Sequence, residues 1–113
     1  MITITYNRQD LSVTVNGHSG YAEIGQDIVC ASVSSLTYAL AKFVDKIYRD
    51  GKLYFEPTLD VIEGKAEIGV VVRNTFEYET RLVFDAICEG YELIAKERPN
   101  NVEFKRVYPQ IKI

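Results

Sequence analysis

The sequence predicts an α+β fold, a two-layer α/β arrangement of two helices on a mostly antiparallel sheet, in the order ββαββαβ. Apolar and polar residues alternate with period two in several short segments, which is typical of strands, and apolar residues recur at helical spacing in two long ones. The 113 residues, 47% of them hydrophobic, suffice for one core. We therefore expect residues 1–113 to form a single domain.

The N-terminal segment is predicted to form a β-hairpin. Ile2, Ile4 and Tyr6 alternate with polar residues, and the alternation resumes over residues 11–16 after a polar turn. The next segment, Gly17 to Gly25, has the sequence GHSGYAEIG. Three glycines within it argue against a stable strand or helix and predict a mobile loop.

A helix is predicted over residues 27–48 and ends at the dipeptide Asp50-Gly51. Its apolar stripe comprises Val29, Val33, Leu36, Leu40, Phe43, Val44 and Ile47.

A second hairpin is predicted over residues 59–72. Its second strand includes the continuous apolar run Val70–Val72, which suggests a central position with both sides covered. A second helix is predicted from Asn74 to about Arg98, followed by a last strand over residues 102–107.

Composition narrows the choice of partner and cellular compartment. The net charge of −3 argues against direct nucleic-acid binding, because phosphate contacts need clustered lysines and arginines. We find no continuous apolar run of about 18 residues, so no membrane contact is expected, and the N-terminus does not resemble a secretory signal. We expect a cytoplasmic protein with reduced thiols. One histidine and two cysteines are too few for a closed zinc site without carboxylates, so neither metal nor cofactor is expected.

His18 and Cys30 are the candidate catalytic pair. His18 follows the second predicted strand, and Cys30 lies in the first turn of the first predicted helix. The first turn presents unpaired amides and a partial positive charge, which favour the nucleophilic thiolate. The same amides can stabilise an oxyanion. The competing interpretation is that Cys30 is a small buried hydrophobe whose proximity to a histidine is coincidental.

Asp27 and Ser34 share the helix face of Cys30, because they are spaced three and four residues from it. Asp27 is either a plain N-cap or a group that orients His18. Ser34 is either a neutral helix residue or a substrate contact. Tyr21, in the loop, is either a lid over the substrate or an exposed aromatic. Cys88, in the middle of the second predicted helix, is interpreted as a packing residue.

The stretch GHSGYAEIGQDIVCASVSSL resembles the signature of the ribosomal-processing cysteine protease family, Prp. That signature is approximately Gly-His-Ala, a glycine-containing loop, then Gly-x-Asp-Ile-Val-Cys-Ala-x-Val-Ser. This chain has serine at position 19 in place of the commoner alanine, a change expected to leave the pair intact. The matching residues are Gly17, His18, Gly25, Asp27, Ile28, Val29, Cys30, Ala31, Val33 and Ser34.

The resemblance implies a thiol protease and a homodimer. It assigns His18 and Cys30 to catalysis, and Gly17, Asp27 and Ser34 to supporting or substrate-binding roles. Members of this family remove an N-terminal extension from the twenty-seventh protein of the bacterial large ribosomal subunit. The resemblance also extends to related proteins of phage genomes, for which a head or scaffold protein is the expected target. The alternative is a non-catalytic binding module of ribosome or phage assembly with the same fold, or a redox sensor that uses Cys30.

Overall fold

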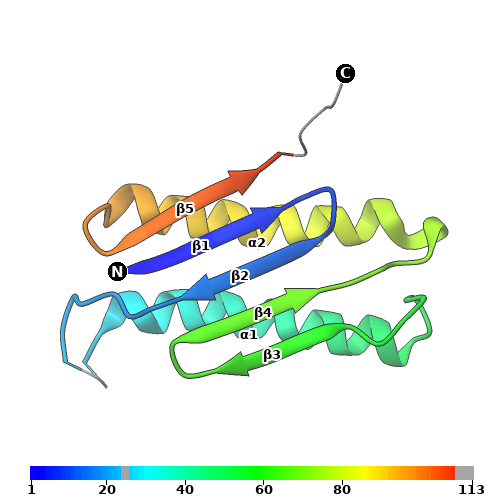
Figure 1. The fold of residues 1–113 in the computed structure, drawn as a ribbon, viewed down its shortest axis with the longest axis horizontal. Coiled ribbons are helices and arrows are strands. Elements are labelled where there is room, and N and C mark those ends of the chain that lie inside the picture. The colour runs from blue at the N-terminus through cyan, green and yellow to red at the C-terminus, as the bar shows by residue number, and fades with distance from the viewer. Residues whose placement is uncertain (24–25, 109–113) are drawn as a thin grey trace.

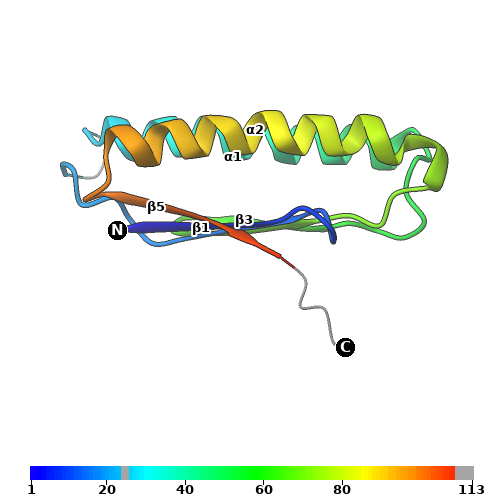
Figure 2. The ribbon, with the colours of Figure 1, turned by 90° about the horizontal axis from the view of Figure 1, so that it is seen from above.

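A computed structural model describes residues 1–23 and 26–108, and it shows a five-stranded sheet with two helices on one face (Figures 1 and 2). The predicted α+β class and the order ββαββαβ are confirmed. The elements are β1 (Ile2–Asn7), β2 (Ser12–Asn16), α1 (Ile28–Arg49), β3 (Thr58–Ile62), β4 (Lys65–Gly69), a 3-10 turn (Asn74–Phe76), α2 (Glu77–Glu97) and β5 (Val102–Val107).

The strand order is β3-β4-β2-β1-β5, and the sheet is mixed. β1 pairs with β2, β2 with β4 and β3 with β4 in antiparallel fashion, whereas β1 and β5 are parallel. The prediction of a mostly antiparallel sheet is thus confirmed, with one parallel pair at the edge. As a consequence, the end of β2 lies at the same end of the sheet as the starts of β1, β4 and β5 (Figure 1).

The core lies between the helices and one face of the sheet. Side chains of β1 and β2 alternate between buried and half-buried, as their sequence pattern predicts. Thr37 of α1 and Tyr91 of α2 are both buried and share a hydrogen bond of 2.7 Å between their hydroxyl oxygens. The largest fully buried side chains are Tyr6, Tyr91, Phe84, Ile4, Leu40, Ile68, Val13, Val44, Val102, Thr80 and Cys88.

α1 is long enough and apolar enough to cross a membrane, judged by length and composition alone. Its most buried side chains face the sheet, and small residues such as Ala31 and Ser35 occupy the outer face. Charged residues such as Lys42 and Asp45 interrupt the apolar residues of α1, so the sequence has no continuous apolar run there. Packing of one stripe onto the sheet is the arrangement of a core helix.

The prediction that Val70–Val72 belongs to a strand with both sides covered is wrong. β4 ends at Gly69, so the valine run lies beyond the strand, and Val72 forms only an isolated bridge with Leu53. Val70 and Val72 are buried, but Val71 is 53% exposed. The three valines alternate between buried and exposed because helices cover only one face of the sheet. β4 itself is an interior strand, as predicted.

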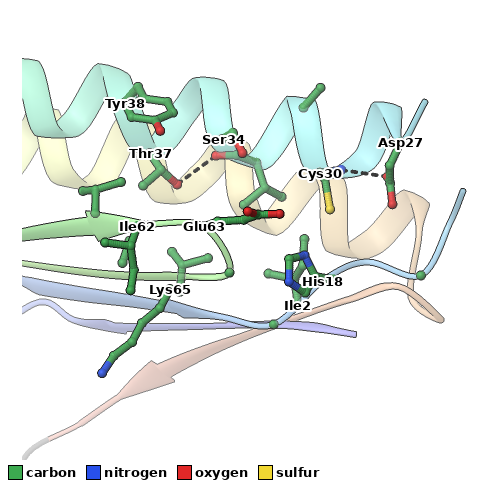
Figure 3. A pocket seen from close by; sticks show the side chains of 18 of the residues that line it. Ile2, His18, Asp27, Cys30, Ser34, Thr37, Tyr38, Ile62, Glu63 and Lys65 are labelled. Atoms are coloured by element: carbon green, nitrogen blue, oxygen red, sulfur yellow. Dashed lines mark hydrogen bonds between the residues drawn. The ribbon is translucent and has the colours of Figure 1, made fainter. Parts of the chain in front are cut away.

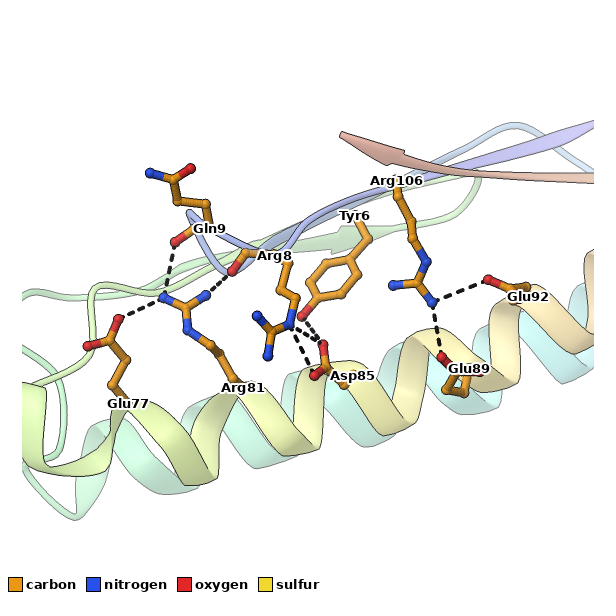
Figure 4. Close-up of polar contacts among 9 residues, drawn as sticks. All are labelled: Tyr6, Arg8, Gln9, Glu77, Arg81, Asp85, Glu89, Glu92 and Arg106. Atoms are coloured by element: carbon orange, nitrogen blue, oxygen red, sulfur yellow. Dashed lines mark hydrogen bonds and ion pairs between the residues drawn. The ribbon is translucent and has the colours of Figure 1, made fainter. Parts of the chain in front are cut away.

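Polar contacts fix α2 against β1 and β5 (Figure 4). The hydroxyl of Tyr6 donates to Asp85 at 2.7 Å, and Arg106 contacts Glu89 at 3.1 Å and Glu92 at 3.2 Å. Exposed ion pairs of this kind contribute little to stability individually. Together they hold the middle of α2 against the ends of β1 and β5.

Candidate active site

A pocket of about 490 Å³ lies between the first half of α1 and the end of the sheet where β4 begins (Figure 3). It is lined by residues of β1, β2, the following loop, α1 and the β3–β4 hairpin. All five of the site residues singled out from the sequence line this one pocket: Gly17, His18, Asp27, Cys30 and Ser34.

Gly17 brings the chain from β2 into the loop. Its φ is +99°, and an added Cβ would lie 2.3 Å from the carbonyl oxygen of Met1. Its amide donates to the carbonyl of Gly64 at 2.9 Å. Both the backbone conformation and the close approach therefore require glycine immediately before His18.

His18 is exposed, and its ring lies against the β3–β4 turn. An added Cβ on Gly64 would be 2.9 Å from Nε2 and 3.3 Å from Cε1 of His18. Figure 3 shows the ring on the sheet side of the pocket, with Cys30 on the helix side. Gly64 thus forms one wall of the space that the imidazole occupies.

Cys30 is half-buried in the first turn of α1 and points toward the sheet (Figure 3). The amide of Ser19, the residue after His18, donates to Cys30 Sγ at 3.4 Å. The loop after β2 therefore brings a hydrogen-bond donor to the sulfur as well as the imidazole to the pocket.

Asp27 is the N-cap of α1, one of the two roles that the sequence offered for it. Its Oδ1 accepts from the amides of Val29 at 3.0 Å and Cys30 at 2.9 Å, and its Oδ2 accepts from the Ser19 hydroxyl. Desolvation acts to raise the pKa of Asp27. The hydrogen bonds from Ser19, Cys30 and Ala22 outweigh it and lower the pKa to about 2.

These bonds bear on the predicted oxyanion site. The amides of Val29 and Cys30 already donate to Asp27, and the amide of Ala31 donates to the Asp27 carbonyl at 3.0 Å. In this conformation none of the three is free to receive an oxyanion. The hydrogen bonds found for Asp27 within residues 1–23 and 26–108 do not include one to His18.

Ser34 is exposed and lines the pocket one turn beyond Cys30. Tyr38 follows on the same side of α1, and Ile62 faces it from β3 (Figure 3). Both are large and exposed, at 58% and 62%. Together they give this end of the pocket an exposed apolar lining.

Tyr21 lies outside the pocket lining and is 45% exposed. The guanidinium carbon of Arg98 is 5.6 Å from the centre of its ring, a cation–π contact. Ile24 and Gly25, at the end of the loop predicted over residues 17–25, lie outside the described residues.

Cys88 is fully buried in the helix layer, which confirms its interpretation as a packing residue. Burial raises the pKa of the Cys88 thiol to about 12. Among the described residues, no group of three or more histidine, cysteine and acidic side chains is placed to hold a metal ion.

Sequence reasoning missed three residues that shape this site. They are Gly64, Ser19 and Asn101, none of which has a site role in the sequence-based prediction. Asn101 donates from its side-chain amide to the Ser19 carbonyl at 2.9 Å. The only local signal in the sequence is a serine directly after the histidine, because the contacts of Gly64 and Asn101 depend on the strand order.

Comparison with known proteins points to the same family as the sequence signature. The family model described as cysteine protease Prp matches residues 1–103. The ribosomal processing cysteine protease Prp of Bacillus subtilis (strain 168) is 30% identical over 86 residues, which are 76% of this chain and 72% of that protein.

Solved structures show the same fold. The essential ribosomal processing protease Prp from S. aureus, in complex with a covalently linked product peptide, matches with a TM-score of 0.74 and 25% identity. That match covers 95% of this chain and 100% of the other. The same protease in complex with a substrate peptide matches with a TM-score of 0.67 and 23% identity over the same shares, and supports the fold.

Proposed function

The chain belongs to the Prp family of cysteine proteases, and on that premise we propose that it cleaves a peptide bond with Cys30 as nucleophile and His18 as general base. One observation carries the assignment of these residues. The single histidine of the chain and the half-buried cysteine line the same pocket, although they belong to different elements. The second cysteine is fully buried elsewhere.

The chemistry proceeds by covalent catalysis. His18 accepts the proton of the Cys30 thiol, and the sulfur attacks the scissile carbonyl carbon. The peptide C–N bond then breaks, the leaving amine takes the proton from His18, and a thioester remains on Cys30. Water, deprotonated by His18, hydrolyses the thioester and regenerates the thiol. Every proton transfer and the transfer of the acyl group are thus accounted for without a cofactor.

The substrate is proposed to be a polypeptide, since relatives were crystallised with a substrate peptide and with a covalently linked product peptide. We propose the N-terminal extension of the twenty-seventh protein of the large ribosomal subunit, or a phage head protein. The names of the relatives, which specify ribosomal processing, support the first. The net charge of −3 is compatible with a basic partner of this kind.

The remaining expectations concern assembly and location. We propose a homodimer in the cytoplasm. Several large apolar side chains are exposed in the single chain, among them Ile28 and Leu93 on the helices. Both cysteines are free thiols, which is compatible with a reducing compartment.

The test is cleavage of a purified ribosomal protein that carries its N-terminal extension. Wild type should release the extension, whereas Cys30→Ala and His18→Ala should reduce the rate at least about 1,000-fold. Cys88→Ala is the matched control, because it removes the other thiol. Unchanged cleavage by Cys30→Ala would contradict the proposed mechanism.

Asp27 is proposed to support the site and not to carry the reaction. Asp27→Ala should therefore retain more activity than Cys30→Ala when both proteins are folded. An equally complete loss in a folded Asp27→Ala protein would place the carboxylate among the reacting groups.

A further inference from the structure

The turn that joins α2 to β5 contacts the loop that carries His18. The side-chain amide of Asn101 donates to the carbonyl of Ser19 at 2.9 Å, across 82 positions of sequence. In the same turn, the Arg98 guanidinium lies over the ring of Tyr21. Two contacts therefore connect this turn to the loop after β2.

Backbone hydrogen bonds hold Asn101 in place for that contact. Its own amide donates to the Arg98 carbonyl at 3.0 Å, and its carbonyl accepts from the amide of Ile2 at 2.8 Å. The next residue, Val102, begins β5 and pairs with Ile2 in the parallel ladder. The backbone of Asn101 is thereby fixed to the sheet, and only its side chain reaches the loop.

Ser19 is held on several sides and is only 2% exposed. Its hydroxyl donates to Asp27 and accepts from the amide of Tyr21, the latter at 3.1 Å. Its amide donates to Cys30 Sγ at 3.4 Å. Ser19 thus connects the N-cap of α1, the loop and the sulfur, and Asn101 connects Ser19 to the sheet.

We propose that Asn101 is a positioning residue, which holds Ser19 so that the Ser19 amide stabilises negative charge on the sulfur of Cys30. An N–H group donates a stronger hydrogen bond to a thiolate than to a thiol, because the acceptor is charged. A fixed donor therefore favours ionisation of the sulfur. This role rests on the proposed function, in which Cys30 is the nucleophile.

Other charged groups near Cys30 act on its ionisation as well. Asp27 caps the same helix, His18 follows β2, and Glu63 and Lys65 come from the β3–β4 hairpin. They all line the same pocket. A substitution at Asn101 leaves all four side chains in place, so its effect on the sulfur reports on the Ser19 contact.

The test measures the rate of Cys30 alkylation by iodoacetamide against pH, with the labelled residue identified by peptide mass spectrometry. Asn101→Ala should shift the midpoint of the Cys30 curve upward, because the Ser19 amide is then held less firmly against the sulfur. Asn101→Leu is close to asparagine in size but lacks the donor and adds no charge, and it should shift the midpoint in the same direction.

Asn100→Ala is the matched control, because Asn100 is an exposed neighbour in the same turn. It should leave the midpoint unchanged. An unchanged midpoint in folded Asn101→Ala and Asn101→Leu would overturn the proposal. A shift in the alanine variant alone would also overturn it, since packing and not the donated hydrogen bond would then be responsible.

A second measurement uses only the wild-type protein and does not depend on the folding of any variant. In an NMR titration, the amide proton of Ser19 should move downfield as Cys30 ionises, with the midpoint found by alkylation. A Ser19 amide that does not respond to Cys30 ionisation would remove the basis of the proposal. Neither readout uses peptide cleavage, so failure of the proposed protease mechanism would be seen separately, in the cleavage assay with Cys30→Ala.

Discussion

The imidazole of His18 rests against the backbone of Gly64, where a Cβ atom would lie 2.9 Å from Nε2. The contact arises because β4 pairs with β2, which brings the β3–β4 turn to the end of the strand that precedes His18. The turn is held there by the bond from the Gly17 amide to the Gly64 carbonyl. A structural turn thus determines how much room the proposed base has.

Gly64→Ala should impair cleavage by displacing His18. The added methyl group must move the ring, and misplacement of a catalytic group by about 1 Å can cost roughly 100-fold in rate. Gly51→Ala is the matched control. Gly51 has φ +75°, close to the +77° of Gly64, but nothing lies within 4 Å of its added Cβ.

Both glycine variants should lose similar stability in urea unfolding, because a side chain is strained at positive φ in each. Only Gly64→Ala should lose cleavage activity. Equal activity of the two variants would show that the Gly64 contact does not constrain His18.

Asp27 should make stability depend on pH at the acid end. Its folded pKa of about 2 lies below the value of about 3.9 for an unperturbed aspartate. The contribution of the ionised carboxylate is therefore fully present above about pH 4 and is lost as pH falls toward 2. In urea unfolding, the gap in stability between wild type and Asp27→Asn should narrow over this window.

Asp60→Asn is the control for this prediction, since it removes an exposed carboxylate of β3 far along the chain from the helix N-terminus. Its difference from wild type is measured over the same pH range for comparison. A constant gap for Asp27→Asn would contradict the hydrogen-bond pattern at the N-cap.

The two thiols should differ strongly in reactivity. Cys30 is half-buried at the pocket, whereas Cys88 is fully buried and burial raises its pKa to about 12. Iodoacetamide at pH 6 should label Cys30 at least about 100-fold faster, because only accessible thiolate reacts. Equal labelling of the two residues in folded protein would remove the distinction between a reactive and a packing cysteine.

Tyr91→Phe should destabilise the helix layer by about 1 kcal/mol, the usual net value of one hydrogen bond. The hydroxyl of Thr37 would keep its bond to the Val33 carbonyl at 2.8 Å, so it would not be left without a partner. Tyr78→Phe is the control, because Tyr78 is 77% exposed. Equal stability of both variants in urea would indicate that the Thr37–Tyr91 bond contributes nothing.

Local patterns predicted most of the fold. The alternation at Ile2, Ile4 and Tyr6 and the helical stripe from Val29 to Ile47 depend on neighbours in sequence, and both elements form as expected. The valine run after Gly69 was misassigned, because its apolar character does not reveal that one side of the chain is left uncovered.

The site was only partly predictable for a related reason. The N-cap was one of the two roles that local sequence offered for Asp27, and Asp27 does cap the helix. The contacts of Gly64 with His18 and of Asn101 with Ser19 join segments distant in sequence, and they follow from β4 pairing with β2 and β5 with β1. No local periodicity encodes such pairings.

The most direct test of the account is to locate the acyl group during cleavage. An extended substrate should be mixed with excess enzyme, quenched in acid on the time scale of one turnover and mapped by peptide mass spectrometry. The N-terminal product, less one water, should be found on the peptide that contains Cys30 in wild type and be absent in Cys30→Ala. An acyl group on Cys88, or full cleavage by Cys30→Ala, would contradict the assignment of Cys30 as the nucleophile.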